Sequence, residues 1–104
     1  MKLHKEFSYL YNKAKNFHSS SVVLFFIPKD GVRRVGFTAT KKVGNAVKRN
    51  RAKRRMRALF FQYQEKLQDG LYIFVAKQKI VEIDFSHVEN DFKRVLKKSS
   101  ALKS

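Results

Sequence analysis

Two short stretches of the chain have the composition of covered β-strands. Residues 21–27 (SVVLFFI) are β-branched and aromatic and stop at Pro28, while residues 71–76 (LYIFVA) form an almost continuous apolar run. A run that is apolar on both faces is typical of a strand covered on both sides. We therefore expect residues 71–76 to form a central or well-covered strand. Both faces of 21–27 are apolar, one with Val22, Leu24 and Phe26 and the other with Val23, Phe25 and Ile27.

A third stretch, residues 33–40, alternates as a half-buried strand does. Val35, Phe37 and Ala39 share one face, and Gly36, Thr38 and Thr40 share the other. Residues 28–31 (Pro-Lys-Asp-Gly) have turn chemistry, which predicts an antiparallel pair between the two flanking strands. A domain this small usually covers one sheet face with helices. The apolar face of Phe25 and the small-residue face of the neighbouring strand are therefore a candidate binding surface.

Three segments have the periodicity of helices. The spacing of Phe7, Leu10, Tyr11 and Ala14 predicts a short helix over residues 6–15, followed by a serine-rich loop over 16–21. A longer helix over 46–67 has an apolar stripe of Ala52, Met56, Leu59, Phe60, Tyr63 and Leu67. A capping box at residues 86–89 predicts a last helix that starts at about His87. Helices packed on a mainly antiparallel sheet make an α+β fold, with residues 1–104 as a single domain.

The net charge of +16 narrows the class of partner. Residues 1–64 hold 16 Lys or Arg against two acids, and residues 65–104 hold 8 against six. The basic surface therefore belongs to the first two thirds of the chain, as expected for a protein with one face for a polyanion. Nucleic acid is the favoured partner. An anionic membrane surface and a merely soluble basic protein are the alternatives.

Most of the charge lies in residues 41–57 (KKVGNAVKRNRAKRRMR), where nine of seventeen residues are Lys or Arg and none is an acid. Gly44 and Asn45 predict a turn into the long helix. On that helix Asn50, Arg51, Arg54 and Arg55 fall on or near the side opposite the apolar stripe, Lys53 and Arg57 flank it, and Arg49 precedes it in line. A solvated helix face usually interleaves acids with its cations, so this face indicates phosphate binding.

The sequence offers no catalytic centre of its own. His4, His18 and His87 lie in unrelated segments, no carboxylates cluster near the basic stretch, and no phosphate-cradling glycine loop is present. Strands with aromatic residues beside a basic helix suit single-stranded RNA, in which bases stack on rings. Because the sequence offers no catalytic centre, a nuclease that cleaves RNA by itself is disfavoured. With no Cys, no membrane-length apolar run and no secretory leader pattern, we expect a cytoplasmic protein without membrane contact.

Residues 34–57 (RVGFTATKKVGNAVKRNRAKRRMR) closely resemble the signature of the bacterial ribonuclease P protein subunit, above all in the run over 41–54. The resemblance extends over the whole chain in length, order of elements and charge. It implies the element order α-β-β-(short β)-α-β-α, with a left-handed βαβ crossover around the basic helix. The general rule for such crossovers predicts the opposite hand.

The resemblance also implies a function. The protein would be a cofactor of ribonuclease P, the ribonucleoprotein endonuclease in which a catalytic RNA removes the 5′ leader of precursor tRNA with Mg²⁺ held mainly by that RNA. Its partners would be ribonuclease P RNA and precursor tRNA, with no further protein required. A general RNA-binding or ribosome-associated basic protein is the alternative.

Carried over by position, two sets of residues acquire roles. The residues that would bind the catalytic RNA are Lys41, Lys42, Asn45, Arg49, Asn50, Arg51, Lys53, Arg54 and Arg57. The residues that would line the cleft for the precursor-tRNA leader are Phe7, Tyr11, Phe25, Gly36, Thr38 and Thr40. The resemblance implies no catalytic residue and no metal ligand in this chain.

Overall fold

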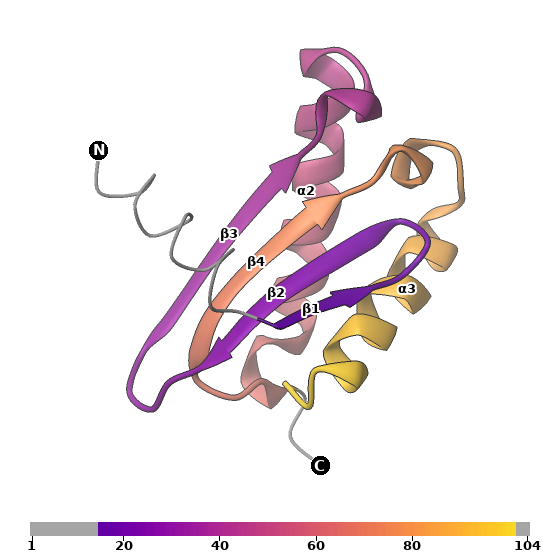
Figure 1. The fold of residues 1–104 in the computed structure, drawn as a ribbon. Coiled ribbons are helices and arrows are strands. Elements are labelled where there is room, and N and C mark those ends of the chain that lie inside the picture. The colour runs from indigo at the N-terminus through magenta and orange to yellow at the C-terminus, as the bar shows by residue number, and fades with distance from the viewer. Residues whose placement is uncertain (1–14, 102–104) are drawn as a thin grey trace, which may run out of the picture.

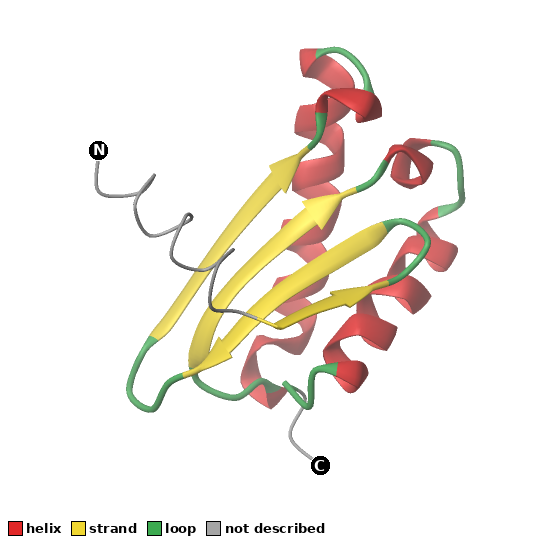
Figure 2. Ribbon diagram, in the orientation of Figure 1, coloured by secondary structure: helices red, strands yellow, loops and turns green. Residues whose placement is uncertain are grey.

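The structure is a computed structural model and describes residues 15–101. This part of the chain forms a four-stranded sheet in the order β1-β2-β4-β3, and both described helices pack on one face of it (Figures 1 and 2). The strands are β1 (Lys15–His18), β2 (Val22–Pro28), β3 (Arg33–Ala39) and β4 (Gly70–Ala76), and the helices are α2 (Ala46–Tyr63) and α3 (Phe85–Lys98). Three 3₁₀ turns, η1 (Lys41–Val43), η2 (Gln64–Lys66) and η3 (Gln78–Val81), complete it.

The pairing of β2 with β3 that the turn chemistry predicted is wrong. Strand β4 lies between them, antiparallel to β2 and parallel to β3. The turn after β2 packs instead on the residues before β4: the Gly31 amide donates to the Asp69 carboxylate (3.1 Å), and the Gly70 amide donates to the Val32 carbonyl (2.6 Å). Only a glycine fits at position 70, because a Cβ there would lie 2.5 Å from the Ile27 carbonyl oxygen. The prediction that the apolar run 71–76 forms a central or well-covered strand is confirmed, since β4 lies between two other strands.

The β3–α2–β4 connection is a left-handed crossover. In Figure 1 the helices lie behind the sheet, β3 and β4 both run upward, and β4 lies to the right of β3. A right-handed connection behind the sheet would place β4 on the other side. The expected α+β class and the expected hand of the crossover are therefore confirmed.

The core lies between the sheet and the two helices. Phe74 of β4 stacks on Phe92 of α3 with ring centroids 4.5 Å apart, and it meets Phe60 of α2 edge-on at 5.8 Å. Phe37 of β3 and Tyr72 of β4 extend this aromatic cluster on both sides. Inward and outward side chains alternate along a strand, so every second residue of a strand points into this core.

Several local predictions are corrected. Residues 15–18, predicted as the end of the first helix and the start of the loop, form β1. The short strand expected after β3 is absent from the described residues, where the 3₁₀ turn η1 follows β3. Helix α2 ends at Tyr63, and residues as far as 66 continue as 3₁₀. The capping box is also wrong: α3 starts at Phe85, and its N-cap residue, Asp84, makes no side-chain cap bond.

The predicted helix over 6–15 lies almost wholly outside the described residues. Within residues 15–101, neither helix is apolar enough over a bilayer's width to be a membrane span.

One buried carboxylate fastens the β1–β2 turn to α3. The Ser20 and Ser21 hydroxyls each donate to Asp91 Oδ2 at 2.6 Å. Burial opposes ionisation of this carboxyl, but the two hydroxyl hydrogen bonds and the Arg94 charge together hold its pKa below the usual range of an aspartate. Asp91 is therefore ionised in the folded protein at neutral pH and joins elements 70 residues apart in the chain.

We expect Asp91→Ala to lower the free energy of unfolding by about 2 kcal/mol at neutral pH, because it leaves the buried Ser21 hydroxyl without its acceptor. A lowered folded-state pKa stabilises the protein above the unfolded-state pKa, and this stabilisation is lost as the pH falls through the folded-state value. Urea unfolding at neutral and acid pH should therefore show the variant and the parent converging in acid. Asp84→Ala, at an exposed aspartate, is the control. A difference that stays constant with pH would contradict this account.

Candidate nucleic-acid interface

The basic helix starts from a turn that is fixed at both ends. After β3, the η1 turn buries Val43, which is 3% exposed, and Gly44 follows with φ 136°, a conformation that favours glycine. The Asn45 side chain then accepts a hydrogen bond from the Lys48 amide at 3.0 Å, and so caps α2. The predicted Gly-Asn turn into the helix is confirmed. It orients the first turn of α2, which belongs to the basic stretch of residues 41–57.

The nine residues predicted to bind RNA gather on η1 and α2. Seven are exposed and two, Arg49 and Lys53, are half-buried. None of the nine forms an ion pair with a carboxylate of residues 15–101. In sequence no acid occurs between Asp30 and Glu65. The surface therefore presents cations without internal neutralisation, which is the condition for attracting a polyanion.

Two arginines of α2 are engaged by the rest of the fold. Arg55, predicted on the side away from the core, instead turns toward η3 and donates to the Ile80 carbonyl at 3.1 Å. The Arg57 guanidinium lies over the Phe37 ring, 5.7 Å from its centroid, which is within the range of a cation–π contact. Arg55 thus fastens α2 to η3, and Arg57 is held on the β3 side of the helix.

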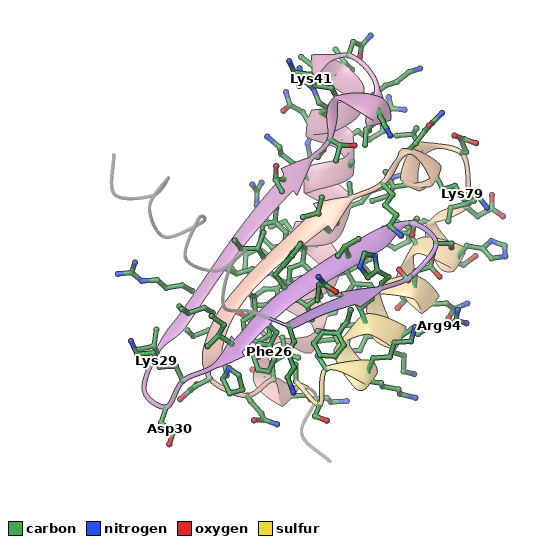
Figure 3. The ribbon with its side chains drawn as sticks, viewed as in Figure 1. Phe26, Lys29, Asp30, Lys41, Lys79 and Arg94 are labelled. Atoms are coloured by element: carbon green, nitrogen blue, oxygen red, sulfur yellow. The ribbon has the colours of Figure 1, made fainter. Side chains whose placement is uncertain are left out.

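The two turns η1 and η3 contact each other because the parallel strands β3 and β4 end side by side. Lys41 and Lys79, one from each turn, lie toward the end of the molecule opposite Lys29 and Asp30 (Figure 3). The cationic end of the molecule therefore combines the turn before α2 with the turn after β4.

Three of the residues predicted to line a leader cleft, Phe25, Gly36 and Thr38, lie on the sheet face opposite the described helices, with strand β4 between them. Phe25 pairs with Ile73 of β4, which pairs in turn with Gly36, so these three form one row across the sheet. Thr38, Val75 and Val23 form the next row. Phe25, Gly36 and Thr38 are half-buried, and Thr40 follows β3 as an exposed residue. Phe7 and Tyr11 lie outside the described residues.

Sequence reasoning missed the β4 contribution to this face. Ile73 and Val75 point to it, since they alternate with the core residues Tyr72, Phe74 and Ala76. The signal was present in the alternation within residues 71–76, but it could be used only once β4 was known to separate β2 from β3. Elsewhere in residues 15–101, no three His, Asp or Glu side chains gather as metal ligands.

The sequence and the fold of this chain have counterparts among known proteins. A family model described as Ribonuclease P matches residues 1–100. The chain belongs to the ribonuclease P protein family. Its relatives include a ribonuclease P protein component from Nitratiruptor sp., 47% identical over 98 residues that cover 94% of this chain and 89% of the relative. Another, from Shouchella clausii, is 34% identical over 98% of this chain and 86% of the relative.

Solved structures support the same fold. The Staphylococcus aureus RNase P protein matches with a TM-score of 0.85 at 24% identity, over 95% of this chain and 93% of that chain.

Ribonuclease P is the ribonucleoprotein endonuclease that acts on precursor tRNA, and family membership makes the chain its protein subunit, with a role in tRNA processing. It also makes ribonuclease P RNA the partner of the chain.

We expect Asn45→Ala to lower the free energy of unfolding by about 1 kcal/mol, because it leaves the Lys48 amide at the start of α2 without an acceptor. Asn45→Ser should keep most of the stability, since a serine hydroxyl can cap the same amide. Urea denaturation of the three proteins measures both values. If the serine variant loses as much as the alanine variant, Asn45 does not stabilise the fold through the cap.

Proposed function

We propose that the protein binds ribonuclease P RNA with η1 and α2 and presents the opposite sheet face to the 5′ leader of precursor tRNA. The observation that carries the first part is the cation-rich helix face, capped by Asn45 and free of acids from residue 31 to residue 64. Binding such a face to phosphates releases condensed counterions, so the affinity falls steeply with salt. The RNA-contacting set is the nine residues named above.

The leader-binding part rests on Phe25, Gly36 and Thr38, the half-buried residues of this sheet face, since Ile73 between Phe25 and Gly36 is only 1% exposed. Gly36 and Thr38 are small residues beside β4, so a base or a nucleic-acid backbone can approach the sheet closely there. Phe25 supplies a half-buried ring at the other side of the row. This arrangement is suited to an extended single strand, whose bases are unstacked and available to aromatic side chains.

Mg²⁺ enters the proposal as a component of the RNA subunit. The described carboxylates do not form a donor set that fits the ion, since Mg²⁺ is bound by oxygen ligands that converge on one point. The bound ion would supply charge neutralisation and an activated water at the scissile phosphate. The residues of this chain hold the RNA and orient the leader. A cytoplasmic location belongs to the same proposal.

Removing one phosphate contact should weaken RNA binding and flatten its salt dependence. We expect Lys42→Ala and Arg51→Ala each to lower the affinity for ribonuclease P RNA and to reduce the slope of log K against log salt by about 1. Lys29→Ala removes the same charge at the opposite end of the molecule and is the matched control for Lys42→Ala (Figure 3). Equal effects at Lys29 and Lys42 would show that net charge, and not this surface, decides binding.

The leader-binding role predicts a difference between two substrates. In the holoenzyme, Phe25→Leu should weaken binding of precursor tRNA about tenfold while mature tRNA binding is little changed, because only the precursor has a leader to stack on the ring. Competition binding with both tRNAs measures the ratio. Equal losses for the two substrates would place the leader elsewhere.

Cleavage of a precursor tRNA at low Mg²⁺ tests the function as a whole. Three reactions are compared: protein alone, bacterial ribonuclease P RNA alone, and the mixture. We expect efficient cleavage only in the mixture. Cleavage by the protein alone would reveal a catalytic centre in this chain, and tight RNA binding without stimulation would indicate a general RNA-binding protein.

A further inference from the structure

One side of α2 carries cationic residues and, near the C-terminal end of the helix, an exposed phenylalanine. Asn50, Arg54, Arg57 and Phe61 follow at intervals of four, three and four residues, which places them on one stripe of the helix. The Phe61 side chain is 58% exposed, although the neighbouring Phe60 is buried in the core. The fold therefore places one of two adjacent phenylalanines outside the core, next to Arg57.

At Arg57 the stripe borders the free side of β3, which pairs only with β4 among the described strands. Arg57 lies over Phe37, and the Arg33 guanidinium donates to the Gln64 and Leu67 carbonyls at 2.7 and 2.6 Å. Val35 lies between these two β3 residues on the same strand face, and therefore at the level of the turn that contains Phe61. Val35 is 37% exposed. Phe61 and Val35 are thus two exposed apolar residues at the same level of the fold, beyond the cations of α2.

The second well-exposed phenylalanine of the described chain has different surroundings. Phe85, at the first residue of α3, is 39% exposed and sits between Asp84 and, one turn later, Glu89. Phe61 instead ends a stripe that contains two arginines, and no acid precedes it in α2, although Glu65 follows it by four residues as Glu89 follows Phe85. Since the chain carries a net charge of +16, a second copy would be repelled from this surface and a polyanion attracted to it.

We propose that Phe61 is a stacking platform for an unpaired nucleobase of ribonuclease P RNA. Arg54 and Arg57 contact the adjoining phosphates, and Val35 lies beside the stacked base. The inference rests on the proposed role of α2 in RNA binding and extends that surface to the far end of the helix. The catalytic RNA is the partner because the stripe lies on the helix side of the sheet, away from the face of Phe25 and Gly36. Base–aromatic stacking tolerates any base, so this contact adds affinity without sequence preference.

Because the chain contains no Trp, Phe61→Trp introduces a single fluorescent reporter at the site. We expect its emission to be quenched when ribonuclease P RNA is added, since a stacked base contacts the indole. Phe85→Trp is the matched control and should not respond. Quenching that is absent at position 61, or equal at the two positions, would overturn the proposal.

Affinity for ribonuclease P RNA gives an independent test. Phe61→Leu should bind about tenfold more weakly with an unchanged salt slope, because a ring is lost and no phosphate contact is. Phe61→Tyr should bind like the parent, and so should Phe85→Leu. Equal losses for the Leu and Tyr variants, or no loss for Leu, would overturn the stacking role.

Arg54→Ala separates this inference from the function on which it rests. If Arg54→Ala lowers the affinity and the salt slope while Phe61→Leu changes neither, the RNA-binding surface stands and the stacking platform does not. If neither variant has an effect, the RNA-binding role of α2 itself is wrong. A concentration-dependent dimer in sedimentation that Phe61→Leu abolishes would assign the patch to a second copy and overturn the proposal.

Discussion

The insertion of β4 between β2 and β3 is the constraint on which the rest of the structure depends. It makes β3 and β4 parallel neighbours, so their carboxyl ends meet and the turns η1 and η3 come into contact. It also forces the intervening chain to cross behind the sheet as α2, antiparallel to β3. Gly70 permits the insertion, because any side chain there would collide with the Ile27 carbonyl where β4 begins.

The same insertion decides where the charge lies. Residues 41–57 repel one another, and nothing within the stretch offsets that repulsion. The fold limits it by spreading the cations over η1 and several sides of α2, and by giving some of them neutral partners. Arg55 donates to a backbone carbonyl, and Arg57 lies over an aromatic ring. These contacts leave both side chains charged, so the surface stays cationic while the helix remains packed.

The sequence was informative for most features that depend on near neighbours, although the local capping box was wrong. Strands β2, β3 and β4, the Gly44–Asn45 turn and the apolar stripe of α2 from Ala52 to Tyr63 follow from residues a few positions apart, and the structure confirms each of them. The pairing of β2 with β3 was predicted wrongly because a good turn does not reveal that a strand 40 residues later will enter between them. The short strand β1 was missed because it is polar at three of its four positions and depends on β2 for its hydrogen bonds.

The candidate site shows the same division between local and distant information. Periodicity placed Asn50, Arg51 and Arg54 on the exposed side of α2, where the structure has them. Periodicity could not show that Arg55 would find the Ile80 carbonyl, because η3 approaches α2 only through the parallel pairing of β3 and β4. The same holds for Ile73, whose place in the row between Phe25 and Gly36 depends on strand order.

Strand β3 connects the two proposed RNA-binding surfaces. The Phe37 side chain of β3 faces the helices and contacts the Arg57 guanidinium. Gly36 and Thr38, on either side of Phe37 in sequence, face the other side of the sheet. A segment of the catalytic RNA on α2 and a leader on the sheet would therefore be separated by the thickness of one strand and its side chains. Because Phe37 is also packed against Phe60 and Phe74, the strand that separates the two proposed surfaces is anchored in the aromatic core. If both proposed contacts form, this one strand sets the position of the leader relative to the catalytic RNA.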